Sequence, residues 1–158
     1  MITELNVDHL TQLVTLERQV QSGISKSQML AALGSQDTSV LGGRQGELLV
    51  SYAIVARLPF EAELQAIGVL PEQRRNGAGW ALMEAVIATS QGWSSERLLL
   101  EVRVGNLNAI RLYQRSGFSE DGRRKGYYPA LGASQANGSP AAGAAAGRED
   151  ALLMSRPL

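Results

Sequence analysis

A glycine-rich turn at the start of a predicted helix is the first stretch of the sequence that suits ligand chemistry. In "EQRRNGAGWALMEAV", residues 72–86, Arg74 is followed by Gly77 and Gly79, and an apolar helical pattern begins directly afterwards. Glycine lets the backbone turn sharply and approach a ligand closely, and the first N–H groups of a helix have no intrahelical partner. The stretch therefore suits an anion such as a pyrophosphate, although an ordinary strand-to-helix turn explains it equally well.

Two common phosphate-binding motifs do not fit this turn. A P-loop carries lysine and a hydroxyl residue after its last glycine, whereas Trp80 and Ala81 follow here. A dinucleotide-binding fingerprint carries a third glycine where this chain has Leu82.

A carboxylate and a phenol lie twelve residues apart further along the chain, at Glu101 and Tyr113. In "RLLLEVRV", Glu101 lies on one face of a predicted strand, and the opposite face is apolar, with Leu98, Leu100, Val102 and Val104. A positioned carboxylate accepts a proton and a positioned phenol donates one during group transfer. The residues alone favour a plainer reading, in which the glutamate is solvated or paired with an arginine and the tyrosine is packed on a helix.

Composition narrows the classes of function. Fifteen basic and fifteen acidic residues cancel, so nucleic acid and membrane are not expected as partners. The absence of cysteine excludes disulfides, thiolate metal sites and a cysteine nucleophile, and His9 is the single histidine, so no metal is expected. The start of the chain lacks a basic and apolar signal, and a soluble cytoplasmic protein is predicted.

The elements that position these residues alternate between strand and helix. Their order predicts one α/β (α+β) domain over residues 1–158, with a mixed sheet and helices on its faces. The predicted strands cover 2–7, 38–43, 46–58, 61–70, 97–104, 118–128 and 149–158, and the predicted helices cover 8–20, 25–34, 78–89 and 106–117.

One segment of the chain has the composition of a loop. Residues 130–147, "ALGASQANGSPAAGAAAG", contain eight alanines and four glycines, and no apolar side chain larger than leucine. Such a segment buries too little apolar surface to offset its ordering entropy, so a mobile loop is expected. A short alanine-rich helical turn is the alternative.

The turn resembles the acetyl-CoA loop, R/Q-x-x-G-x-G/A, of the GNAT acetyltransferases. Further stretches match, in order and spacing, the RimI-type enzymes, which are ribosomal-protein-alanine N-acetyltransferases: "AIGVLPEQRRNGAGWALM", "LLLEVRVGNLNAIRLYQRSGF", "RRKGYYP" and "GREDALLM". The resemblance covers residues 47–158 well and the first 46 residues weakly. It implies a GNAT fold, with a mixed, mostly antiparallel seven-stranded sheet flanked by about four helices.

The resemblance also implies an acetyl-CoA site. Backbone groups of the turn are expected to hold the pyrophosphate, the strand end is expected to hold the pantetheine arm and thioester, and Asn106 is expected to touch the co-substrate. The turn residues are Arg75, Asn76, Gly77, Ala78, Gly79 and Trp80, and the strand-end residues are Ile67, Gly68 and Val69, with the Val69 N–H as a candidate oxyanion donor.

The same resemblance assigns chemistry to the carboxylate and the phenol. It implies that Glu101 accepts the proton of the acceptor amine and that Tyr113 protonates the departing thiolate. Tyr127 and Tyr128 match tyrosines near the peptide-binding groove, with packing at a strand end as the alternative. The neighbouring Arg123, Arg124 and Lys125 are expected to form a solvated strand face.

The chain departs from the family pattern at two places. Trp80 stands where relatives carry a basic residue, and "QSGISKS" replaces a Pro-Trp pair between the first two helices. Because that connection helps to form the acceptor site, the departure leaves the acceptor open. The prediction is acetyl transfer from acetyl-CoA to a protein N-terminal amine, best an N-terminal alanine of a small-subunit ribosomal protein. The alternatives are acetylation of lysine side chains or a small-molecule amine, and a non-enzymatic acetyl-CoA-binding regulator.

Overall fold

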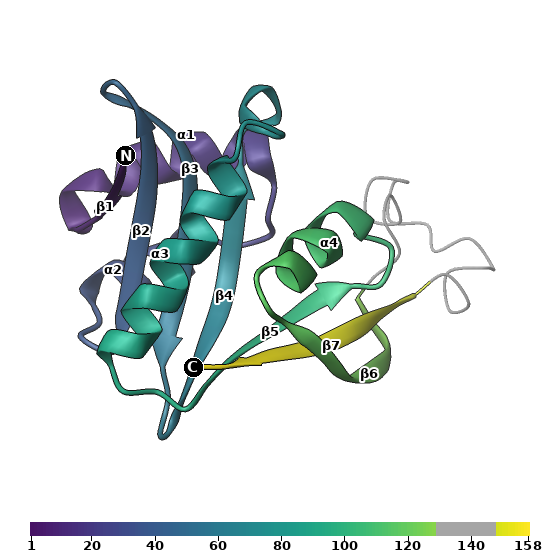
Figure 1. Ribbon diagram of the computed structural model, residues 1–158. Helices are drawn as coiled ribbons and strands as arrows, with labels where there is room; N and C mark the ends of the chain where they lie inside the picture. The colour runs from purple at the N-terminus through teal and green to yellow at the C-terminus, as the bar shows by residue number, and fades with distance from the viewer. Residues whose placement is uncertain (129–147) are drawn as a thin grey trace. The chain divides into compact units, whose positions relative to one another are not determined.

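A computed structural model describes residues 1–128 and 148–158 of the chain (Figure 1). The stretch at 130–147, expected to be a loop, lies outside the described residues. The strands are β1 (Ile2–Glu4), β2 (Thr38–Gln45), β3 (Leu48–Arg57), β4 (Glu61–Val69), β5 (Arg97–Arg103), β6 (Ser119–Tyr128) and β7 (Glu149–Pro157), and the helices are α1 (Leu10–Val20), α2 (Lys26–Gly34), α3 (Ala78–Gly92) and α4 (Leu107–Arg115), with short 3-10 helices η1 (Val7–His9) and η2 (Pro71–Gln73).

The chain forms two compact units. The first holds Met1–Leu99 with Pro157–Leu158, and the second holds Leu100–Arg156. Strand β5 contributes to both, and the strands hydrogen-bond in the order β1-β2-β3-β4-β5-β7-β6. The predicted mixed, mostly antiparallel sheet of seven strands with four helices is confirmed.

Helices cover both faces of the sheet in the first unit. Eight consecutive residues of β3 are buried, which an antiparallel strand shows only when each of its faces is covered. Leu13 and Leu16 of α1 and Met29 of α2 pack in one cluster with Tyr52 and Ile54 of β3. Helix α3 contacts β2, β3 and β4, and Figure 1 shows it crossing the sheet on the face opposite α1 and α2.

Strand β4 has different partners along its two edges. Its antiparallel ladder with β3 runs from Arg57↔Ala62 to Ser51↔Val69. Its parallel ladder with β5 ends after three pairs, at Glu63↔Leu99. Among the described residues, the second edge of β4 therefore carries no strand from Leu64 to Val69.

Gly68 lies near the end of β4 under the last residue of α1. A Cβ atom built at Gly68 would lie 2.6 Å from Val20 Cγ2 and 3.2 Å from Tyr52 Cε1. Real Cβ atoms do not approach neighbours this closely, so α1 reaches its position on the sheet only because residue 68 has no side chain.

The second unit is built on β5, β6, β7 and α4. Burial alternates along β5, with Leu98, Leu100 and Val102 buried, as predicted for an apolar face opposite Glu101. Helix α4 begins at Asn106, whose side-chain oxygen accepts from the Ala109 N–H at 3.3 Å. The predicted asparagine start of this helix is confirmed.

Strand β6 is irregular near its end. Its ladder with β7 passes from Arg124↔Ala151 to Tyr128↔Glu149, so three residues of β6 face the single residue Asp150 of β7. Gly126, in the middle of the three, has a φ of +60°, a conformation that favours glycine.

The close approach at Gly68 leads to a prediction about stability. Gly68→Ala should lower the free energy of unfolding by about 1–3 kcal/mol, because the added methyl group overpacks against Val20 and Tyr52. Gly92→Ala is the matched control, since a Cβ atom at Gly92 meets nothing within 4 Å at the end of α3. The control should be neutral or more stable by up to about 1 kcal/mol. Chemical denaturation measures both, and a Gly68→Ala protein as stable as the parent would contradict the packing argument.

Candidate functional site

The predicted site residues fall into two groups, one in each compact unit. The first unit carries the end of β4 and the glycine turn. The second unit carries Glu101, Asn106, Tyr113, Tyr127 and Tyr128.

The glycine turn leaves the first N–H groups of α3 without a cap. Gly77 is the N-cap residue, with a φ of +81°, and no side chain caps the helix. The first helical hydrogen bond of α3 runs from the Ala81 N–H to the Gly77 oxygen at 2.9 Å. The N–H groups of Ala78, Gly79 and Trp80 precede that bond and are available to an anion.

The backbone of this turn is held in an uncommon conformation. Arg75 has a φ of +70°, which non-glycine residues seldom adopt. Arg74 Nε donates to the Val69 oxygen at 3.1 Å, so the turn is tied back to the end of β4. The Arg74 side chain therefore has a structural contact. Its partner Val69 belongs to the predicted pantetheine strand.

The end of β4 has no strand along one edge among the described residues, although the Val69 oxygen accepts from Arg74 Nε. Ile67, Gly68 and Val69 lie beyond the last pair of the β4–β5 ladder, while β3 occupies their other edge. A strand edge without a partner presents a row of N–H and C=O groups, which suits an extended ligand with amide groups.

The connection between α1 and α2 is held by a carboxylate. Glu17 accepts from the Ser22 hydroxyl at 2.8 Å, from the Gly23 N–H at 2.9 Å and from the Tyr52 hydroxyl at 2.8 Å. Burial raises the pKa of the Tyr52 phenol, with a smaller effect of Glu17 in the same direction. This polar network shapes the stretch in which the Pro-Trp pair is replaced.

Glu101 is paired with an arginine of β6. Arg124 Nη2 lies 3.3 Å from Glu101 Oε1, and the Glu101 side chain keeps 26% of its exposure. The expectation that Arg124 belongs to a solvated face was incomplete, since its side chain is half exposed yet contacts Glu101 and the Tyr127 ring, 5.1 Å from its centroid. Helix α4 separates the strand of Glu101 from the strand of Arg124 in the sequence, so no local pattern indicated the pair.

Two tyrosines at the end of β6 contact each other and two arginines. The rings of Tyr127 and Tyr128 meet edge to face at 4.9 Å between centroids, and Arg103 lies 4.5 Å over the Tyr128 ring. Neighbours on a regular strand point to opposite faces, so this contact depends on the irregular end of β6. Burial raises the pKa of the Tyr128 phenol, and the charge of Glu101 raises it further.

Tyr113 is buried against another aromatic ring. Its residue exposure is 4%, and its ring packs 5.9 Å from that of Phe118. Burial raises the pKa of the Tyr113 phenol, and Tyr128 raises it further.

Asn106 has a structural contact of its own. Its side-chain oxygen caps α4 at Ala109, which leaves its amide NH₂ as the group able to meet a ligand. Within residues 1–128 and 148–158 no helix is long and apolar enough to cross a membrane, and no cluster of three potential metal ligands occurs.

The sequence matches known acetyltransferases. The model of the acetyltransferase (GNAT) family matches residues 9–118. Over 114 residues the chain is 35% identical to the [ribosomal protein bS18]-alanine N-acetyltransferase of Escherichia coli (strain K12), covering 72% of this chain and 68% of that protein.

Solved structures agree in fold. The crystal structure of the ribosomal-protein-S18-alanine N-acetyltransferase from Escherichia coli superposes with a TM-score of 0.84 at 28% identity, covering 99% of this chain and 92% of that one. The PaiA N-acetyltransferase of Thermoplasma acidophilum, solved in complex with coenzyme A, superposes with a TM-score of 0.75 at 16% identity, covering 100% and 98%. The chain therefore belongs to the acetyltransferase (GNAT) family, and its co-substrate is acetyl-CoA.

Proposed function

We propose that this protein transfers the acetyl group of acetyl-CoA to the N-terminal α-amine of a protein. The proposed acceptor is the N-terminal alanine of a small-subunit ribosomal protein, the class named for the Escherichia coli relative. The observation that carries the proposal is the Glu101 carboxylate, which pairs with Arg124 and whose charge raises the pKa of the Tyr128 phenol. A carboxylate in this setting suits proton removal from an amine.

Acetyl-CoA is proposed to bind both the glycine turn and the end of β4 in the first unit. The uncapped N–H groups of Ala78, Gly79 and Trp80 hold the pyrophosphate, together with backbone groups of the strained Arg75–Gly77 turn. The free edge of β4 at Ile67–Val69 holds the pantetheine arm, and the Val69 N–H faces the thioester oxygen. Asn106, in the second unit, is proposed to meet acetyl-CoA through its side-chain amide NH₂.

The transfer needs a neutral amine and a stabilised leaving group. Acetyl-CoA supplies the acetyl group as a thioester. Glu101 takes a proton from the acceptor ammonium, whose pKa is about 8, directly or through one water molecule. The neutral amine then forms the new C–N bond as the C–S bond breaks and coenzyme A leaves as its thiolate. The nitrogen loses one of its two remaining protons to water as the amide forms.

Tyr113 is proposed to stabilise the sulfur as it leaves. Its raised pKa keeps the phenol protonated at neutral and mildly alkaline pH. A phenol, with an ordinary pKa of about 10, is already a weaker acid than a thiol of pKa about 8.5, and the rise widens the difference, so full proton transfer to the sulfur is uphill. The hydroxyl therefore acts mainly as a hydrogen-bond donor to the developing thiolate.

The acceptor side is proposed to involve Tyr127 and Tyr128. Tyr127 is 45% exposed. Arg124 lies over the Tyr127 ring, and Arg103 lies over the Tyr128 ring. The altered connection between α1 and α2 leaves the acceptor open, and the second candidate is a lysine side chain or a small-molecule amine. A cytoplasmic location stays a prediction from composition.

A comparison of acceptors tests the proposed function. The purified protein should release coenzyme A with a peptide that begins with alanine, and mass spectrometry should find one acetyl group on its α-amine. The same peptide with a blocked N-terminus and an internal lysine should react far more slowly, as should polyamines. Faster reaction of lysine or a polyamine would shift the proposal to the second candidate, and no release with any amine would support a non-enzymatic regulator.

Removal of the Tyr113 hydroxyl should slow turnover. Tyr113→Phe should lower kcat by about 100-fold or more, because the developing thiolate loses its donor, with little change in acetyl-CoA affinity. Because the Tyr113 pKa is raised, the parent rate should not fall through ionisation of this phenol between pH 8 and about 10. Steady-state kinetics across that range measure both. A variant as fast as the parent, with chemistry rate-limiting, would leave Tyr113 a packing residue.

Loss of the Glu101 carboxylate should give a deficit that depends on pH. Glu101→Gln keeps the shape but not the basicity, so the rate at pH 7 should fall by about 100- to 10,000-fold while acetyl-CoA still binds. The deficit should shrink above the amine pKa of about 8, where the acceptor is already neutral. The measurement is the pH profile of peptide acetylation.

Glu120→Gln is the matched control for that profile. Glu120 also pairs with an arginine of β6, Arg123 at 3.5 Å, but both side chains are about half exposed. The Glu120→Gln variant should acetylate the peptide at the same rate as the parent. A constant Glu101→Gln deficit from pH 7 to 10 would mean that the carboxylate positions the amine without deprotonating it.

A further inference from the structure

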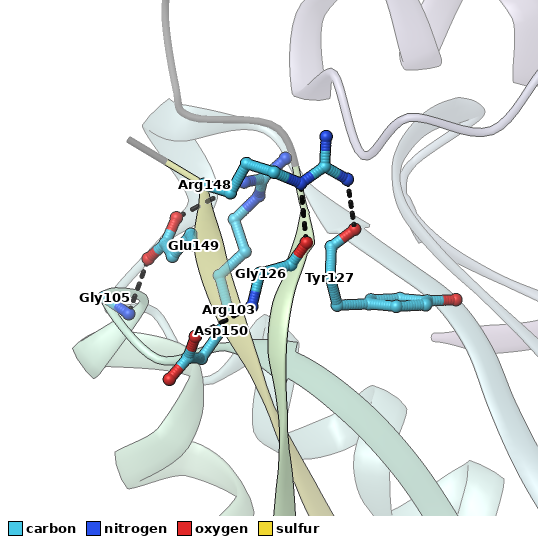
Figure 2. A network of polar contacts seen from close by, with 7 residues as sticks. All are labelled: Arg103, Gly105, Gly126, Tyr127, Arg148, Glu149 and Asp150. Atoms are coloured by element: carbon cyan, nitrogen blue, oxygen red, sulfur yellow. Dashed lines mark hydrogen bonds and ion pairs between the residues drawn. The ribbon is translucent and has the colours of Figure 1, made fainter. Parts of the chain in front are cut away.

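Three consecutive charged residues at the start of β7 contact other parts of the second unit (Figure 2). Arg148 Nε donates to the Gly126 oxygen at 2.6 Å and its Nη2 donates to the Tyr127 oxygen at 3.3 Å. Asp150 Oδ1 accepts from the Gly126 N–H at 2.9 Å. These contacts satisfy the backbone groups that the irregular end of β6 removes from its ladder with β7.

Glu149, the middle residue of the three, joins two other elements. Its Oε2 accepts from the Gly105 N–H at 2.8 Å, in the turn between β5 and α4. Its Oε1 lies 3.3 Å from Arg103 Nη1, and the two side chains keep only 18% and 27% of their exposure. Figure 2 shows this carboxylate between the turn and the arginine.

The turn is built closely around this carboxylate. A Cβ atom at Gly105 would lie 2.5 Å from Glu149 Oε2, so any larger residue would displace the carboxylate from the amide. Gly105 needs no positive φ, and the close approach alone accounts for the glycine.

The two contacts of Glu149 lead to two different parts of the proposed site. Gly105 directly precedes Asn106, the residue that caps α4 and is proposed to meet acetyl-CoA. Arg103 lies over the Tyr128 ring, which is proposed to contact the acceptor. One carboxylate therefore holds a residue for each substrate.

We infer that Glu149 is a positioning residue of the transfer reaction, which places Tyr128 through Arg103 and Asn106 through the Gly105 amide. The inference rests on the proposed function for the roles of Tyr128 and Asn106. The inference gives Glu149, in the "GREDALLM" stretch, the role of placing two other residues. This role differs from the co-substrate binding proposed for the glycine turn and from the proton removal proposed for Glu101.

The two contacts can be separated by substitution. Glu149→Gln retains an oxygen that accepts from the Gly105 N–H but loses the charge that pairs with Arg103. Gly105→Ala keeps the charge but pushes the carboxylate away from the turn. Glu149→Ala removes both contacts.

Calorimetry on the full-length protein measures the effect on each substrate without requiring turnover. We expect Glu149→Gln to weaken binding of the alanine-starting peptide to the coenzyme A-saturated protein by about tenfold, with acetyl-CoA affinity within about twofold of the parent. Gly105→Ala should weaken acetyl-CoA by about tenfold, and Glu149→Ala should weaken both substrates by a similar factor. Glu120→Gln removes an ion pair elsewhere in the same unit and should change neither affinity.

A merely structural role would give a different pattern. Equal losses for both substrates in Glu149→Gln, in proportion to a lowered melting temperature, would overturn the inference, as would parent-like affinities in Glu149→Ala. If Glu149→Ala does not fold, the other two variants test the inference. Glu149→Gln should weaken mainly peptide binding, and Gly105→Ala should weaken acetyl-CoA binding.

The experiment separates this inference from the proposed function. The acceptor chosen by the parent protein tests the proposed function, and whichever amine the parent binds is then used with the variants. If no amine binds, an acetyl-CoA affinity lowered in Gly105→Ala and Glu149→Ala but kept in Glu149→Gln supports the placement of Asn106. Unchanged affinity in all three overturns it.

Discussion

The short parallel ladder between β4 and β5 is the constraint on which the proposed co-substrate site depends. Three residue pairs join the strands, and beyond Glu63↔Leu99 the edge of β4 has no strand partner among the described residues. Buried backbone groups must find partners, so a strand that loses its neighbour part-way is costly unless water or a ligand takes the neighbour's place. The antiparallel ladder with β3, which shifts register between Ile54 and Val55, continues to Val69.

The glycine turn that follows β4 also leaves backbone groups without a capping side chain. Arg74 ties the turn to the Val69 oxygen, Arg75 and Gly77 adopt positive φ, and α3 begins without a side-chain cap. A capping serine or aspartate would stabilise the isolated helix by about 1 kcal/mol but would occupy the N–H groups that an anion needs. The missing cap and the strained backbone are thus consistent with a site whose binding partner completes the helix.

In the second unit, charge is arranged in pairs around two tyrosine rings. Glu101 pairs with Arg124, and Glu149 pairs with Arg103. Each arginine also lies over one tyrosine ring, Arg124 over Tyr127 and Arg103 over Tyr128. Partly buried charges cost less when paired, and the paired side chains restrict one another, so the proposed base and the proposed acceptor residues share one polar framework.

The sequence by itself determined the features that depend on residues close together in the chain. Alternating burial along β5, the asparagine start of α4, the end of α2 at Gly34 and the glycine turn all depend on residues within a few positions of one another. The order of strands and helices followed from the same patterns, and the family resemblance supplied the sheet. Only the tertiary structure decided that Arg124 pairs with Glu101, that Gly68 lies under Val20, and that Glu149 meets the Gly105 amide. These partners are brought together by strand register and by the irregular end of β6. A shift of one residue in register turns each side chain to the opposite face, and local patterns do not encode that choice.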